Sequence, residues 1–205
     1  MSYDTLPTED RINRAIGALK ERGVEAIVVP DRVAALAKVK ELIPQGVSID
    51  NGSSRTLEEI GLIDLLKEGQ HGWNNLHAAV VAEKDPAKQM MLRKEALMSD
   101  YYLGSVHAIS ETGEMVDASA SGSQIPALAF TAKHLVLVAG TQKLVSTLAD
   151  GLTRVKDYVF PLEDARMKSK GAPGTLLAKI LIIAHEHPMM GRTVQLILVN
   201  EKLGF

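Results

Sequence analysis

The chain has 205 residues, with 23 lysines and arginines, 25 aspartates and glutamates, and no cysteine. A formal charge of -2, without any block of like charge, gives no electrostatic basis for binding nucleic acid or an anionic membrane surface. The missing cysteines exclude disulfides, thiolate nucleophiles and Cys-ligated zinc or iron–sulfur sites within this chain.

Targeting and membrane-spanning segments are not predicted. The first residues are polar and acidic, unlike the basic and then apolar start of a secretory signal. The two most apolar runs, 134–140 and 175–184, fall far short of the roughly 20 residues that a membrane helix needs. We therefore expect a cytoplasmic protein with no membrane or nucleic-acid partner.

Strands and helices alternate in the first third of the chain. Apolar residues recur at helical spacing in the first segment, and short β-branched runs ended by Pro30 or by polar loops indicate strands. Asp31 is a natural N-cap. The expected elements are a helix over 8–23, a strand over 25–29, a helix over 31–43, a strand over 47–50 and a helix from 56 that Gly61 interrupts.

The rest of the chain continues the alternation. The expected elements are a loop over 69–75, a helix over 85–98, a strand over 101–110, a turn over 111–113, a strand over 114–118, a loop over 119–124, a helix from 125, a strand over 134–139, a helix from 141 to 155 and a last strand over 193–200. This order predicts an α/β fold: a single domain over 1–205, with a mostly parallel sheet flanked by helices and the helix of 1–23 packed on it.

Three loops between an expected strand and an expected helix carry small or polar residues. Parallel sheets bind ligands beyond the carboxyl ends of their strands, where glycine allows close approach and helix N-termini favour anions. Each loop taken alone is equally consistent with ordinary helix capping. The candidate ligand-binding residues are Asn51, Gly52, Ser53 and Ser54, then Ser121, Gly122, Ser123 and Gln124, then Gln142 and Lys143 after Thr141.

Glu111 is the candidate catalytic residue, because it follows an apolar strand and precedes a Thr112-Gly113 turn. Burial would raise the pKa of its carboxyl and suit it to act as nucleophile or general base. The alternative is a solvated hairpin turn. No metal site is predicted, because the two imidazoles of His185-Glu186-His187 diverge on a helix and no third ligand is identifiable.

Several segments resemble the lactate-utilisation (LUD) domain family, which includes lactate-utilisation protein C. The most specific segments are ISETGEMVDASASGSQIPALAF (109–130) and VAGTQKLV (138–145), with SASGSQ and Gln142-Lys143 as their core. Residues 52–62, 160–166, 179–183, 191–192 and 198–205 are similar to the family in the same order. The resemblance covers nearly the whole chain from the first helix onward.

The resemblance implies a fold of the ribose-phosphate isomerase and CoA-transferase-like type and a role in bacterial oxidation of L-lactate to pyruvate, beside iron–sulfur partner subunits. Within this wider fold group a Ser/Thr-rich loop can bind phosphate and a glutamate can act as nucleophile. By that analogy Gly52 to Ser54 and Glu111 would take these roles. Within the family, the chain looks closer to a branch with Ser-Gly-Ser-Gln at 121–124 and no cysteine-rich segment after Pro173.

Three functional hypotheses follow from these patterns. The first is a LUD-domain protein that binds a small anionic metabolite through the three loops and Thr112-Gly113, as a subunit or accessory protein of L-lactate utilisation. The alternatives are a stand-alone acyl-transferase or isomerase that uses Glu111, and a non-catalytic interaction subunit. No cofactor is identifiable in the chain, and self-association into a homo-oligomer is left open.

Overall fold

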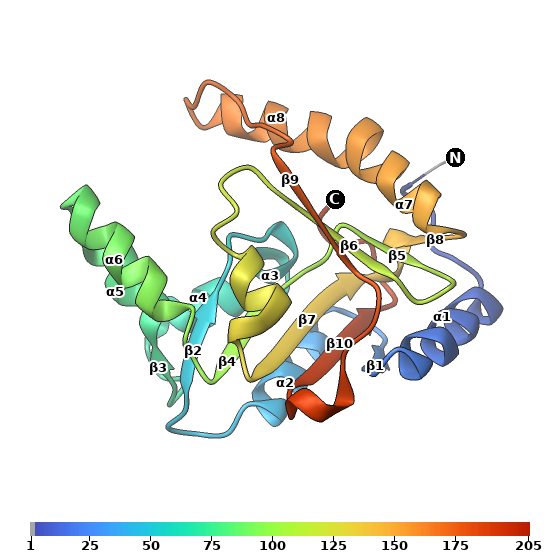
Figure 1. The fold of residues 1–205 in the computed structure, drawn as a ribbon, viewed down its shortest axis with the longest axis horizontal. Helices are drawn as coiled ribbons and strands as arrows, with labels where there is room; N and C mark the ends of the chain where they lie inside the picture. Colours follow the sequence, from blue (N-terminus) through green and yellow to red (C-terminus); the bar gives the residue numbers. More distant parts are fainter. Residues whose placement is uncertain (1–2) are drawn as a thin grey trace.

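The computed structural model describes residues 3–205 and contains two β-sheets (Figure 1). Every neighbouring pair of strands in the first sheet runs parallel. Its strands, in spatial order, are β1 (Val24–Val29), β10 (Thr193–Val199), β7 (His134–Gly140), β4 (Tyr101–Gly104), β2 (Ser48–Asn51) and β3 (Asn74–Asn75). The predicted α/β class with a mostly parallel sheet flanked by helices is therefore confirmed.

Helices cover both faces of this sheet. Leu135 and Leu137 of β7 face a cluster that includes Ile12 of α1, whereas Val136 and Val138 face a second cluster around α2, α3 and α4. Alternate side chains of one strand are thus buried on opposite faces, as its continuous apolar run predicts. The helices are α1 (Glu9–Glu21), α2 (Arg32–Leu42), α3 (Arg55–Glu59), α4 (Leu62–Glu68), α5 (Leu76–Ala82), α6 (Pro86–Ala96), α7 (Leu148–Arg154) and α8 (Phe160–Ser169).

A second, smaller sheet corrects the prediction of one strand over 101–110. The chain leaves the first sheet after Gly104 and enters the second at Ala108, and residues 105–107 connect the two sheets. The second sheet has the order β8 (Leu144–Val145), β5 (Ala108–Ser110), β6 (Met115–Ser119) and β9 (Lys179–Ile183). The predicted turn over 111–113 connects its antiparallel β5–β6 pair.

The helix predicted from 141 to 155 is also corrected. Residues Thr141–Lys143 form a single 3-10 turn, and strand β8 follows before the helix begins. Helix α7 starts only at Leu148, where Thr147 and Asp150 form a reciprocal capping box. The helix expected from 125 is a short π-helical turn, Ala127–Thr131, and Val155–Val159 is a second such turn between α7 and α8.

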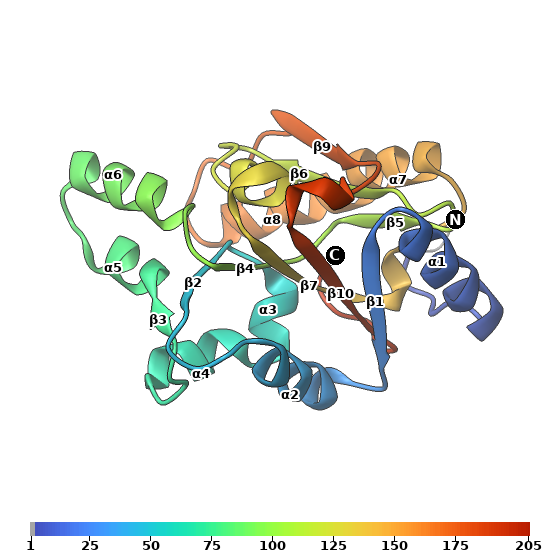
Figure 2. The same cartoon turned by 60° about the horizontal axis from the view of Figure 1, so that its bottom comes forward.

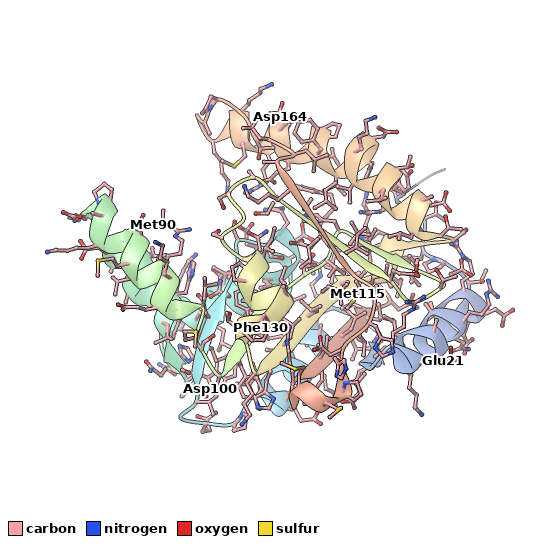
Figure 3. All side chains as sticks on the ribbon, in the orientation of Figure 1. Glu21, Met90, Asp100, Met115, Phe130 and Asp164 are labelled. Carbon is pink, nitrogen blue, oxygen red and sulfur yellow. The ribbon has the colours of Figure 1, made fainter. Side chains whose placement is uncertain are left out.

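Helices α5 and α6 form an arm that extends beyond β2 and β3 (Figures 1 and 2). Asp85 caps α6 through the backbone N–H groups of Ala87 and Lys88, and Pro86 stands at its first position, as predicted. Met90, on the outer part of this arm, is 53% exposed (Figure 3). Among residues 3–205, no helix is long and apolar enough to cross a membrane.

Candidate functional site

A cavity of about 430 Å³ lies at the carboxyl ends of β2 and β4. Its other walls come from the end of β6 and the loop after it, from the α7–α8 region and from the α5–α6 arm. In a parallel sheet the strand ends share one edge, so loops that are distant in sequence meet there. The cavity therefore lies where the sequence predicts a ligand site.

Most of the predicted loop residues meet at this cavity. The predicted residues that line it are Asn51, Gly52, Ser53, Ser54, Ser121, Ser123, Gln124 and Lys143. Gly52 is required there because a Cβ at this position would lie 2.6 Å from the Tyr102 hydroxyl. Two predicted residues of these loops do not line the cavity. Gly122, in the loop over 121–124, packs against the Lys179 side chain, and the Gln142 side chain donates a 2.7 Å hydrogen bond to the Leu203 carbonyl.

Glu111, Thr112 and Gly113 lie apart from the cavity, at the turn of the β5–β6 hairpin. The Glu111 carboxylate accepts hydrogen bonds from Arg11 at 2.5 Å and Arg14 at 2.7 Å, both on α1. Burial alone would raise the pKa of Glu111, but the two guanidinium groups outweigh it and hold the pKa below its usual range. The group is thus an ion-paired carboxylate, neither a raised-pKa base nor a solvated turn residue.

Two carboxylate–histidine pairs lie in the cavity wall, and neither was predicted. His107 Nδ1 is 2.8 Å from the Asp117 carboxylate, and His77 Nδ1 is 3.2 Å from that of Asp50. Both aspartates are buried, with 3% and 6% exposed surface. The His107–Asp117 pair could have been predicted from the turn over 111–113. The antiparallel register that pairs Ala108 with Val116 also places His107 opposite Asp117.

His107 Nδ1 has two close neighbours. The Ala118 N–H donates a hydrogen bond to this nitrogen at 3.0 Å, and the Asp117 carboxylate lies 2.8 Å from the same atom. The other ring nitrogen, Nε2, makes no hydrogen bond to residues 3–205, and His107 lines the cavity. Nε2 can therefore exchange a hydrogen bond with a ligand, as donor or acceptor according to the tautomer.

Tyr102 lines the cavity together with the two aspartates, and with them forms its floor. It is the register partner of Asp50 on the neighbouring strand, so both side chains point to the same face of the sheet. Burial, together with the charges of Asp50 and Asp117, raises the pKa of the Tyr102 phenol. The hydroxyl therefore stays protonated and can donate a hydrogen bond into the cavity.

Lys143 is the only predicted candidate whose charge is fully buried. Its ammonium donates to Thr56 Oγ1 and Ser105 Oγ at 3.0 Å and to the Val106 carbonyl at 3.1 Å. These bonds hold residues 105 and 106, where the chain leaves the first sheet. Burial, and then the charge of Arg154, lowers the pKa of Lys143 to about 7.

Three arginines surround the cavity, and they differ in whether an acid neutralises them. Arg55 is paired with Glu58 and Glu59, and Arg166 is paired with Glu163. Arg93, on α6 of the arm, lines the cavity without any hydrogen bond or ion pair to residues 3–205. No group of three or more His, Asp or Glu side chains in this described part of the chain is arranged to hold a metal ion.

Comparisons with known proteins agree with this architecture. The crystal structure of a DUF162 family protein from Deinococcus radiodurans is similar with a TM-score of 0.55 and 14% identity, over 96% of this chain and 100% of that one. At that identity the likeness concerns the fold. No curated protein matches the chain. The model of the LUD domain matches residues 12–173, and the chain therefore belongs to the LUD domain family.

Proposed function

We propose that the cavity binds a small anionic metabolite and that Arg93 meets the negative charge of that ligand. The observation that carries the proposal is the contrast among the three arginines, since Arg93 alone has no acidic partner within residues 3–205. A guanidinium presents a planar fork of donors that suits a carboxylate or a phosphate. Serine hydroxyls from two loops supply further donors in the same cavity.

The family provides the cellular context for this proposal. LUD-domain membership associates the chain with lactate utilisation at the family level. We propose that it serves L-lactate oxidation as a subunit or accessory protein beside iron–sulfur subunits. Oxidation of lactate to pyruvate releases two electrons, and this chain has no cysteine with which to ligate an iron–sulfur cluster. The purified chain alone is expected not to reduce a redox dye with L-lactate, and reduction would contradict the partner assignment.

The position of Glu111 gives no support to the acyl-transferase or isomerase alternative. Its carboxylate is held by two arginines of α1 and does not line the cavity. A carboxylate with a depressed pKa, whose two oxygens both accept hydrogen bonds from guanidinium groups, is a weak nucleophile towards an acyl group. If the protein is an enzyme, its chemistry belongs in the cavity.

The test of anion binding is calorimetric titration with L-lactate, pyruvate and inorganic phosphate. Wild type is expected to bind at least one of them, and Arg93→Gln to bind it at least tenfold more weakly. The matched control is Lys94→Gln, which removes an exposed positive charge from the next position of the same helix without touching the cavity. Equal affinity of wild type and Arg93→Gln would overturn the proposal, as would the failure of all three anions and of larger anions such as gluconate to bind.

A further inference from the structure

The cavity differs in character between its floor and the arm. On the arm, Arg93 offers a positive charge that no group of residues 3–205 pairs. On the floor, Asp50 and Asp117 are buried carboxylates, and each is held by a histidine at Nδ1. The charge of a bound anion is therefore best placed at the arm. On the floor the two carboxylates would repel it, and the Lys143 ammonium near them already donates three hydrogen bonds to protein groups.

The floor is equipped for neutral hydrogen-bonding groups. One carboxylate oxygen of Asp50 has no protein partner among residues 3–205 and can accept a hydrogen bond. The Nε2 atoms of His77 and His107 have no partner in this part of the chain either, and each can donate or accept according to its tautomer. The Tyr102 hydroxyl beside them has no such partner either and can donate or accept. A ligand hydroxyl both donates and accepts, and so matches this mixture of groups.

A ligand ammonium fits the floor less well than hydroxyls do. The Lys143 ammonium and the Arg154 guanidinium are already buried nearby, and Asp117 is among the charges that act on Lys143. A further cation would be repelled by both of them. Neutral hydroxyls satisfy the same acceptors without adding charge.

The size of the cavity points to a ligand larger than lactate. At about 30 Å³ for each water, its volume of about 430 Å³ corresponds to roughly a dozen waters. Lactate has six heavy atoms and a single hydroxyl, so it would fill only part of this space. We propose that the ligand is a polyhydroxylated anion, a sugar carboxylate or sugar phosphate, with its charge at Arg93 and its hydroxyls on Asp50, His77 and His107.

This inference rests on the proposed anion binding and is tested separately from it. Calorimetry compares gluconate with hexanoate and 6-aminohexanoate, which share its carbon number and carboxylate, and compares glucose 6-phosphate with inorganic phosphate. At least one polyhydroxylated anion is expected to bind at least tenfold more tightly than its hydroxyl-free counterpart. Equal or tighter binding of the hydroxyl-free counterparts or of 6-aminohexanoate would overturn the inference, even where Arg93 still controls anion binding.

Variants separate the two ends of the ligand. Asp50→Asn keeps the shape of the side chain but removes the buried charge, and it is expected to reduce the hydroxyl advantage at least threefold while dependence on Arg93 remains. His77→Gln, at a side chain that is 30% exposed, is a second variant for the same effect in case the first does not fold. Lys94→Gln should leave every affinity unchanged. A full hydroxyl advantage in both floor variants would contradict the assignment of the hydroxyls to the floor.

Discussion

The two ends of the β5–β6 hairpin are held by opposite charge chemistry. At the turn, Glu111 and Glu114 accept hydrogen bonds from arginines of the α1 region, and the pKa of both carboxyls is lowered even though burial opposes the shift. At the cavity end, Lys143 is fully buried beside residues 105 and 106, and its pKa is lowered because the charged form is disfavoured. Ionisation of Glu111 and Glu114 therefore stabilises the turn, whereas ionisation of Lys143 destabilises the fold at the cavity end.

The comparison explains why the same hairpin contributes to structure at one end and to a candidate site at the other. Saturated carboxylates fix α1 on the second sheet and leave no group free for a ligand. At the cavity end the pairs are incomplete, since His107 has a ring nitrogen and Arg93 a whole guanidinium without a protein partner in the described residues. Unsatisfied groups that face a cavity are what a ligand can complete.

The largest expected effect concerns pH. The pKa of Lys143 is about 7 in the folded protein and near 10.4 when unfolded, so between these values the unfolded chain binds a proton that the folded chain does not. The free energy of unfolding should therefore rise from pH 7 towards pH 10, by up to about 1.4 kcal/mol per pH unit from this one group. Urea denaturation across this range should show the rise in wild type, and the rise should be smaller in Lys143→Met.

The control for this prediction is Lys94→Met, which removes an exposed lysine and should keep the wild-type slope. Tyrosines with raised pKa values act with the opposite sign only at higher pH, so the window below pH 10 is informative. Superimposable slopes of wild type and Lys143→Met would show that Lys143 carries no depressed pKa.

The next effect is steric and belongs to the turn. Gly113 has φ of +94°, and a Cβ there would lie 2.7 Å from the Ala18 carbonyl oxygen of α1. Gly113→Ala should therefore lower the free energy of unfolding by about 3 kcal/mol, from backbone strain together with the clash. Gly171→Ala is the matched control, because φ is +82° but nothing lies within 4 Å, and strain alone predicts about 1 kcal/mol. Similar losses in the two variants would contradict the close contact between hairpin and α1.

Much of the fold could be predicted from local patterns, whereas the site could be predicted only in part. The apolar run of β7 and the Asp85-Pro86 helix start depend on neighbours in sequence, and both were correct. The break at Ser105 depends on Lys143, which is distant in sequence, so no local pattern indicates it. The same limit hid Arg93, since nothing in the helix sequence shows that the arm returns it to the cavity.

Glu111 and His107 lie on the same hairpin but differ in how far their partners could be predicted from the sequence. The residues around Glu111 do not show that α1 would bring Arg11 and Arg14 to it. The partner of His107 was within reach, because a turn centred on Thr112 already sets it opposite Asp117. Prediction of the site therefore failed where long-range packing decides and was incomplete where register alone would have sufficed.

A smaller effect is expected when the cavity end loses its carboxylate. Asp117→Asn removes the buried charge that lies 2.8 Å from His107 Nδ1, while the Ala118 N–H still donates to that nitrogen at 3.0 Å. Gluconate affinity, measured by calorimetry, should fall about tenfold, equivalent to about 1.4 kcal/mol. Glu111→Gln serves as the control at the other end of the hairpin and should keep the wild-type affinity. Unchanged gluconate affinity in Asp117→Asn would contradict a role for the buried carboxylate in the site.

The smallest expected effect is the loss of the Glu111 charge itself. The side chains of Arg11 and Arg14 are 34% and 58% exposed, so solvent screens both ion pairs, and Glu111→Gln should lower the free energy of unfolding by about 1 kcal/mol at pH 7. Because the folded pKa of Glu111 is depressed, wild type should lose this advantage as the pH falls below about 4, and the two urea curves should converge. Glu41→Gln, which removes an exposed carboxylate paired with Lys38, should change stability by less than about 0.5 kcal/mol. Weaker binding of gluconate or phosphate by Glu111→Gln, at unchanged stability, would reverse the contrast between the two ends and return Glu111 to the functional site.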